Sequence, residues 1–358
     1  MDFAAHRKPE IFAPGTLRAR IQATTERALH SGALQPIPTD FLHLDDGGIR
    51  FLVRLVRRLA HKPRCPVPES SPKKGTGTTP NRGLACGQVQ PVVEPVPVFS
   101  GKPSSPSAPA SIAKPNPFLP YEPALYVADA SPTHVCLLNK FNVVDEHLLI
   151  VTREFEEQQT PLTRQDFAAL WKCLAEYEGL GFYNSGSVAG ASQPHKHLQL
   201  VPLPLEPDGP SLPIAPLIDA AEIRSPATRL PSLSFPHAIA RLAANPTAVS
   251  SQHAADQMWN LYRRLLAAIG VCWPSPGESF AEAYNLLVTR CWMLAVPRVR
   301  ECFESISCNA LTFAGALLVR HEQELELLRR YGPQAVLRHV TGVAPGDMTM
   351  GTDVGKLR

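Results

Sequence analysis

The chain has 358 residues, which is enough to bury a large core and to form one big domain or two modest ones. Its 35 basic and 32 acidic side chains leave a net charge of +3, which argues against a dedicated nucleic-acid binder, whose affinity would rest on many contacts to phosphate. The eight cysteines include no Cys-x-x-Cys pair, and no apolar run resembles a signal peptide or a membrane span. These features predict a soluble, cytoplasmic protein.

The N-terminal third combines a predicted helix, a predicted strand and a long biased segment. Residues 15–31 predict an amphipathic helix, because apolar residues recur there at helical spacing. Residues 49–56 predict a strand, and a basic stretch that ends at Lys62 follows it. Residues 63–115 hold roughly a third of all the prolines and few large apolar side chains, so they cannot offset the entropy of ordering. They predict a flexible surface insertion.

The middle of the chain predicts antiparallel hairpins followed by a helix. Apolar β-rich runs occur at residues 125–127, 134–138 and 147–151. A helix is predicted from Thr160 to Leu180, with Thr163 as its N-cap and Asp166 completing an approximate capping box. His147 leads one apolar run, and both a packing role and a functional role are open for it.

Proline-rich sequence separates this part from the C-terminal part. Residues 206–252 predict a long excursion with a short helix near residues 237–244. A helix, two paired strands, and then one final helix or two short ones are predicted at residues 256–269, 284–289 with 292–297, and 311–330. The tail after Thr341 is left without an assigned element.

The most informative stretch runs from Gly186 to Val201. It begins with small residues, whose backbone N–H groups can approach phosphate oxygens, and it ends with alternating polar and apolar residues that predict a strand. On such a strand His195, His197 and Gln199 point one way, and the leucines between them point into a core, led by Lys196. This pattern favours phosphoryl or nucleotidyl chemistry. A structural His pair or a zinc site is less favoured, because no further ligands stand at short spacing.

A family resemblance is carried by these residues. His195-Lys196-His197-Leu198-Gln199 resembles the His-x-His-x-Gln signature of the nucleotidyltransferase branch of the histidine triad superfamily. The run from Phe182 to Gly186, the run from Gly190 to Gln193 and Tyr284-Asn285-Leu286-Leu287 are similar to the diadenosine tetraphosphate phosphorylase family, also called ATP adenylyltransferases. The resemblance implies an α+β fold, with a HIT-like antiparallel sheet, flanking helices and a C-terminal α/β block.

The resemblance also implies a domain organisation. It covers most of the chain from Arg50 to about Arg320, apart from the insertion. The expected parts are an N-terminal segment of the catalytic domain (1–62), the insertion (63–115), a HIT-like catalytic core (116–205), the proline-rich excursion (206–252), a C-terminal phosphorylase block (253–340) and a tail (341–358).

The resemblance implies that His197 attacks a phosphoanhydride and becomes adenylylated, with His195 as a supporting group. It implies that diadenosine tetraphosphate and phosphate react to ATP and ADP, and that the reaction is reversible. Gln199 fits transfer to phosphate, because a carboxamide has no pKa in range and cannot activate water as a third histidine could.

The substrate contacts that the resemblance implies come from several segments. They are expected from Lys62, Asn142, Asn184, Gly190, Ala191, Ser192, Gln193, Asn285, Thr289 and Arg290. A turn or cap role competes with this for the asparagines, above all for Asn142. The expected partners are small nucleotides and phosphate. No tightly bound cofactor and no protein-held metal are expected, although Mg²⁺ can accompany the substrate phosphates.

Two alternatives stay open. The same signature occurs in hexose-1-phosphate uridylyltransferases and sugar-nucleotide phosphorylases, which place a proline between the histidines where this chain has Lys196. A non-catalytic module that binds dinucleoside polyphosphates is the other alternative. The complete set of His195, His197 and Gln199 argues against it.

Overall fold

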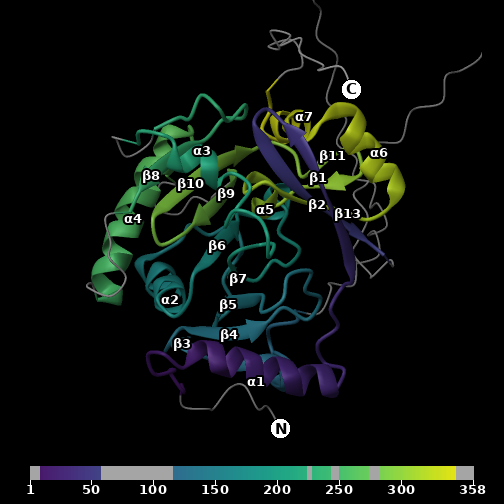
Figure 1. Ribbon diagram of the computed structural model, residues 1–358. Helices are drawn as coiled ribbons and strands as arrows, with labels where there is room; N and C mark the ends of the chain where they lie inside the picture. Colours follow the sequence, from purple (N-terminus) through teal and green to yellow (C-terminus); the bar gives the residue numbers. More distant parts are fainter. Residues whose placement is uncertain (1–8, 58–115, 224–227, 243–249, 274–281, 344–358) are drawn as a thin grey trace, which may run out of the picture. The chain divides into compact units, whose positions relative to one another are not determined.

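An eight-stranded antiparallel sheet lies at the centre of the fold (Figure 1). The computed structural model describes residues 9–57, 116–223, 228–242, 250–273 and 282–343. The strands of this sheet, in spatial order, are β3 (Tyr126–Ser131), β4 (His134–Leu138), β5 (Leu148–Thr152), β7 (His197–Pro202), β6 (Gly179–Asn184), β9 (Ala283–Val288), β10 (Trp292–Arg298) and β8 (Ala238–Arg241). The α+β fold class is thereby confirmed.

The sheet joins parts that the sequence treats as separate. β6 pairs with β9, so strands from residues 116–205 and from residues 253–340 lie in one layer. The expected catalytic core and the expected C-terminal block therefore share one sheet. The predicted insertion and most of the tail lie outside the described residues, as does Lys62.

Three helices cover one face of the sheet. They are α1 (Leu17–His30), α2 (Arg164–Leu174) and α4 (Ser251–Ala268), and their apolar sides share a core with Leu198, Leu200 and Leu286. In Figure 1, α1 runs beside β3 and β4, and α4 runs beside β8 and β10. The burial of this apolar face contributes most of what holds these helices in place, because an isolated helix of this length is marginal in water.

A second layer packs on the opposite face. It contains a three-stranded sheet of β1 (Thr39–Asp46), β2 (Ile49–Val56) and β13 (Ala316–Val319), with β13 parallel to β2. Four helices pack with it: α3 (Ala215–Asp219), α5 (Ala310–Phe313), α6 (Glu322–Tyr331) and α7 (Pro333–Val340). Short elements complete the described chain: η1 (Pro123–Leu125), η2 (Ser187–Ala189), β11 (Cys302–Phe303) and β12 (Ile306–Ser307).

Helix α2 shows how local sequence sets the approach of a helix to the sheet. Thr163 and Asp166 form the predicted capping box, which fixes the first turn. Gly181 on β6 lets the helix pack closely, because a Cβ atom there would come within 2.7 Å of a Leu170 methyl group. The predicted end at Leu180 is wrong: the helix ends at Leu174. The guanidinium of Arg290 donates to the carbonyl oxygens of Leu174 and Ala175, which satisfies the last turn.

One further prediction of helix is wrong, and another is confirmed only in its form of two short helices. Residues 238–241 form strand β8 at the edge of the sheet, where Ala238 and Ile239 pair with β10 and are buried on both faces. Residues 311–330 were predicted as one helix or two short ones, and the structure has two, α5 and α6. Strand β13 between them was not predicted; Gly315 takes a φ of +91° and ends the preceding helical turn. Strand β1 was not predicted, although Gly47 and Gly48 join it to β2 in a tight hairpin.

The other predicted elements are confirmed with shifted ends. The helices predicted at residues 15–31 and 256–269 correspond to α1 and α4, and the paired strands after residue 283 correspond to β9 and β10. No helix among the described residues combines the length and the apolar character that crossing a membrane requires.

Candidate active site

His197 begins β7 on the face opposite the main core. Leu198 is fully buried among the helices, as predicted, and so the side chains of His197 and Gln199 point to the other face. The ring centroid of Phe118 lies 5.3 Å from that of His197 and 5.6 Å from that of His195. Both imidazoles therefore pack against the same aromatic ring.

The protonation state of His197 is set by one hydrogen bond. Its Nδ1 lies 2.8 Å from the backbone carbonyl oxygen of His195, which can only accept, so Nδ1 carries the proton and Nε2 carries the lone pair. The side chain is 4% exposed, and burial lowers the pKa of His197 to about 4. At neutral pH the residue is thus an uncharged imidazole with Nε2 as its nucleophilic atom.

His195 contributes through its backbone, because both of its ring nitrogens are engaged elsewhere. The side chain of Asn116 donates to Nδ1 at 3.0 Å, and Nε2 donates to the carbonyl oxygen of Thr152 at 2.8 Å. The ring is fully buried, and burial lowers the pKa of His195 as well. The carbonyl oxygen of His195 fixes the tautomer of His197.

Gln199 is oriented by a short relay. Nε2 of His147 lies 3.0 Å from Oε1 of Gln199, and Nδ1 of His147 lies 3.1 Å from the side-chain nitrogen of Asn139. Asn139 can only donate through that nitrogen, so the proton of His147 sits on Nε2 and is donated to Gln199. This hydrogen bond orients the carboxamide of Gln199 through its oxygen atom. The NH₂ group of Gln199 takes no part in the relay.

The small-residue stretch before the histidines is a tight turn around η2. Gly190 has a φ of +88°, and a Cβ atom there would lie 2.4 Å from the carbonyl oxygen of Cys308, so only glycine fits. The amides of Gly190 and Ala191 donate within the turn, to Ser187 and Gly186. These two amides are therefore not free to bind phosphate, which corrects part of the expectation. Ser192 is exposed and Gln193 is partly exposed at the start of the next segment.

A buried polar cluster of Asn184, Asn285 and Arg298 stabilises this turn. The side chain of Asn285 donates to Asn184 Oδ1 and to the carbonyl oxygen of Ala189, both at 2.8 Å. Arg298 donates to Asn285 Oδ1 at 2.6 Å and to the carbonyl oxygens of Ala189 and Cys308. Burial lowers the pKa of Arg298 to about 10, so the guanidinium stays charged at neutral pH. Asn184 and Asn285 thus brace the turn.

A second buried cluster lies behind the histidine strand. Lys196 is fully buried, and its Nζ lies 3.0 Å from Asp166 Oδ2 and 3.0 Å from Glu156 Oε2. His134 donates to Asp166 Oδ1 at 3.0 Å. Burial alone would raise the pKa of Asp166, but the hydrogen bond from His134 and the charge of Lys196 hold it well below its usual range. The position between the two histidines is therefore anchored to the N-terminus of α2.

Not every predicted site residue joins this arrangement. Thr289 and Arg290 lie in the turn at the far end of β9, four residues from Asn285 and so roughly 13 Å along the strand. Arg290 binds the end of α2 there, so a role for these two residues in substrate binding is not supported. Asn142 lies in the loop between β4 and β5, where its Nδ2 donates to Val144. Its buried Oδ1 has no hydrogen-bond partner among the described residues.

Several residues of the arrangement were not predicted as site residues. Gln158 hydrogen-bonds to the backbone of His197, Asn116 to the ring of His195, and Arg298 to the cluster below the turn. Asn116-Pro117-Phe118 and Pro297-Arg298 also resemble short motifs of the phosphorylase family, and this was the signal available in the sequence. Gln158 carries no such signal, because nothing in its local sequence places it beside a strand that begins 39 residues later.

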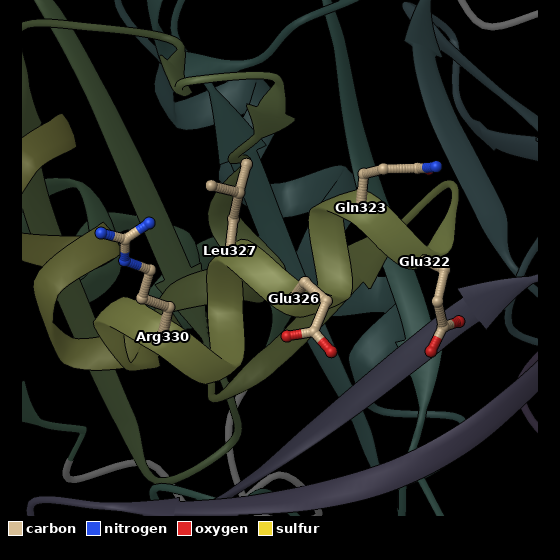
Figure 2. Close-up of a pocket in the computed structure, with 5 residues that line it drawn as sticks. All are labelled: Glu322, Gln323, Glu326, Leu327 and Arg330. Atoms are coloured by element: carbon tan, nitrogen blue, oxygen red, sulfur yellow. The ribbon is translucent and has the colours of Figure 1, made fainter.

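Within the described ranges, no group of three or more His, Cys, Asp and Glu side chains is arranged to hold a metal ion. A pocket of about 540 Å³ opens along helix α6, where Glu322, Glu326 and Arg330 are among the lining residues (Figure 2). Two carboxylates make this lining unsuited to a polyphosphate. Of the residues predicted for the site, none that the structure describes lines this pocket.

Comparison with protein families matches two descriptions. Residues 7–91 and 99–220 match the Ap4A phosphorylase N-terminal domain, and residues 231–343 match the ATP adenylyltransferase C-terminal domain. Diadenosine 5',5'''-P1,P4-tetraphosphate phosphorylase 2 of Saccharomyces cerevisiae is 29% identical over 214 residues, which are 54% of this chain and 64% of that protein. Protein APA1 of the same yeast is 27% identical over 209 residues, which are 52% and 61%. The match thus spans less than two thirds of either relative.

Solved structures support the fold. The crystal structure of yeast Ap4A phosphorylase Apa2 superposes with a TM-score of 0.65 at 21% identity, covering 91% of this chain and 94% of that chain. The crystal structure of Apa2 in complex with Ap4A gives a TM-score of 0.64, with 91% and 97% covered. Because the first family description alone accounts for more than half of the 358 residues, the chain belongs to the Ap4A phosphorylase N-terminal domain family.

Proposed function

We propose that the protein is a nucleotidyltransferase that cleaves diadenosine tetraphosphate with phosphate to give ATP and ADP. The observation that carries this proposal is the hydrogen bond from His197 Nδ1 to the His195 carbonyl oxygen, because it leaves the lone pair on Nε2 of an uncharged imidazole. The family membership and the Ap4A complex of the relative Apa2 support the choice of substrate.

The first step is attack of His197 Nε2 on the phosphorus atom bonded to one adenosine. A P–N bond forms, the anhydride bond to the second phosphate breaks, and ATP leaves with the electron pair on its terminal oxygen. The proton on Nδ1 stays hydrogen-bonded to the His195 carbonyl oxygen, which stabilises the positive charge that develops on the ring. The product is an adenylylated His197.

The second step is attack of inorganic phosphate on the adenylyl group, which releases ADP and restores the imidazole. Gln199 favours phosphate over water as the acceptor, since its carboxamide can bond phosphate oxygens but cannot remove a proton from water. The relay from Asn139 through His147 supports this role, because it fixes Gln199 Oε1 and leaves the NH₂ group as the donor.

The remaining expectations belong to the same proposal. Mg²⁺ would accompany the substrate phosphates rather than occupy a protein site. Asn142 supports a contact to ribose or base, because its buried Oδ1 lacks a hydrogen-bond partner within the part of the chain that the structure describes. A cytoplasmic location is expected for the protein, and cell fractionation tests it.

The test is product analysis with diadenosine tetraphosphate, with and without phosphate, for wild type and His197→Ala. We expect ATP and ADP in equal amounts, dependent on phosphate, and a loss of about 10⁴-fold or more in the variant, because the covalent step is removed. Equal turnover without phosphate would show that water is the acceptor and that Gln199 does not select phosphate.

Two other outcomes assign the alternatives. Turnover of a sugar nucleotide but not of the dinucleotide would identify a sugar-nucleotide transferase. Binding of the dinucleotide without any acid-labile label on the protein would identify a non-catalytic binding module.

A further inference from the structure

The central sheet splits between β6 and β7 at the end where the candidate nucleophile lies. The two strands pair from Gly179 as far as Phe182, which lies opposite Gln199. Continuing that register would place Asn184 opposite His197. Instead, among the described strands, Asn184 pairs only with β9, and His197 pairs only with β5, opposite Val151. The backbone groups of Asn184 and His197 that would have bonded to each other must find other partners.

The side chain of Gln158 occupies the split and supplies those partners. Its Oε1 accepts from the N–H of His197 at 2.8 Å. Its Nε2 donates to the carbonyl oxygen of Asn184 at 2.9 Å and to that of His197 at 3.2 Å. One carboxamide thus takes the place of a peptide group between two diverging strands.

Gln158 is itself held firmly. The residue is 2% exposed, its N–H donates to the carbonyl oxygen of Pro194 at 2.6 Å, and the hydroxyl of Tyr183 donates to its carbonyl oxygen. Because its backbone and its side chain are both hydrogen-bonded, Gln158 has a defined position, and it can hold the groups that it bonds in place. Those groups are the backbone N–H and carbonyl of the candidate nucleophile.

We propose that Gln158 is a positioning residue for His197, which it holds at the opening of the sheet so that Nε2 faces the scissile phosphate. The inference rests on the proposed function and adds a residue to it that touches no substrate. Without the Gln158 side chain between them, β7 would be free to move toward β6 or away from it. A displacement of the imidazole by about 1 Å is enough to cost about 10²-fold in rate.

Only a carboxamide satisfies all three backbone groups at once. An ionised glutamate at this position would turn acceptor oxygens toward the carbonyl groups of Asn184 and His197, and it would have nothing to donate. A protonated glutamate would restore one donor while its other oxygen still accepts from the His197 N–H. The Gln158→Glu variant should therefore work in its acid form and fail in its ionised form.

The experiment measures kcat and KM of wild type, Gln158→Glu and Gln158→Met for phosphate-dependent cleavage of diadenosine tetraphosphate from pH 5.5 to 8.5. Relative to wild type, kcat of Gln158→Glu should fall by about 10²-fold as pH rises across this range, with KM little changed. Gln158→Met should lose a similar factor at every pH. Titration of Tyr183, His195 or His197 is shared with wild type, so the ratio isolates the new carboxyl group.

The matched control is Gln323→Glu, which makes the same chemical change on the exposed surface of α6 (Figure 2). It should keep wild-type kcat at every pH. A kcat ratio for Gln158→Glu that does not vary with pH, or a kcat equal to wild type, would overturn the proposal.

A measurement on the wild-type protein covers the case in which the variants do not fold. By hydrogen exchange, the amide proton of His197 should be as protected as those in the middle of β7, because Gln158 accepts from it. Fast exchange at His197 would contradict the proposal. This result does not depend on turnover, so it stands apart from a failure of the proposed function, which would appear as an inactive wild type.

Discussion

Uncharged groups hold the central side chains of the candidate site. The carbonyl oxygen of His195 fixes His197, the carboxamide of Asn139 fixes His147, and Arg298 binds backbone carbonyls and Asn285. A carboxylate in these places would raise the pKa of the imidazoles and would repel a polyphosphate. Burial lowers the pKa values of His195 and His197, and no carboxylate among these contacts opposes that effect. The contacts of Arg298 named here are likewise all to uncharged groups.

The pKa of His197 predicts the acid limit of activity. Because burial lowers this pKa to about 4, protonation of Nε2 should halve the rate of enzyme adenylylation only near that pH. An imidazole with its usual pKa would lose half of its rate near pH 6.5. The measurement is the burst of ATP release from diadenosine tetraphosphate without phosphate, at pH values from 4 to 8. A midpoint near 6.5 would contradict the assigned environment of His197.

The guanidinium of Arg298 predicts a large effect of a conservative substitution. Arg298→Lys should lower the free energy of unfolding by about 2–4 kcal/mol, because an ammonium group cannot reach acceptors that lie along both edges of the planar guanidinium. Urea denaturation measures the change. Arg329→Lys on α6 is the control, since its ion pairs at 3.8 Å are exposed and contribute little. Equal stability of the two variants would contradict the role given to Arg298.

At the scale of helices and strands, the sequence predicts elements whose signal is local. The capping box of α2 lies within one helical turn, and the apolar stripe of α4 lies on one helix face, so both helices were predicted. Strand β8 was predicted as helix, and β13 was missed between the two short helices. Alanine and leucine suit either state, and pairing with distant strands decided the outcome. The end of α2 depends on Arg290, which is 116 residues away from Leu174. No local sequence pattern predicts where this helix ends.

The contact between α2 and β7 predicts strong coupling between two buried charges. Lys196→Met and Asp166→Asn should each lower the free energy of unfolding by about 3–5 kcal/mol, because each leaves a buried charge with fewer partners. The double variant should lose less unfolding free energy than the sum of the two single losses, by about 0.5–3 kcal/mol, because the two charges disappear together.

A double-mutant cycle by urea denaturation tests this coupling. Arg164→Met with Asp256→Asn is the control, because that pair is about half exposed on both sides. Strict additivity for Lys196 and Asp166 would show that the two side chains do not stabilise each other.

At the scale of the whole molecule, the site is assembled from segments that are far apart in the sequence. It combines residues of the central sheet with residues of the loops beside it: 116, 118, 139, 147, 158, 195–199, 285 and 298. The His-x-His-x-Gln signature could be found from the sequence because its residues lie within five consecutive positions. Gln158 could not be found, because its role exists only where β6 and β7 diverge, and that divergence is a property of the folded sheet.

Burial of His197 and His237 makes the stability of the fold sensitive to mild acid. His197 and His237 both have pKa values lowered to about 4 by burial, and His237 Nε2 accepts from the N–H of Leu230, so each must stay neutral in the folded state. In the unfolded chain both regain a pKa near 6.5. The unfolded state therefore binds more protons between pH 6.5 and 4, and stability falls as the pH falls through that window.

Each of these two histidines should contribute a slope of roughly 1.4 kcal/mol per pH unit within that window. Urea denaturation at pH 7.5, 6.5, 5.5 and 4.5 measures the total slope. His237→Gln should lower stability at pH 7.5 but reduce the slope by roughly 1.4 kcal/mol per pH unit within that window, because the proton uptake of His237 on unfolding is removed. His253→Gln, on the exposed surface of α4, should leave the slope unchanged. A slope that His237→Gln does not alter would show that His237 is not held neutral by its buried contacts.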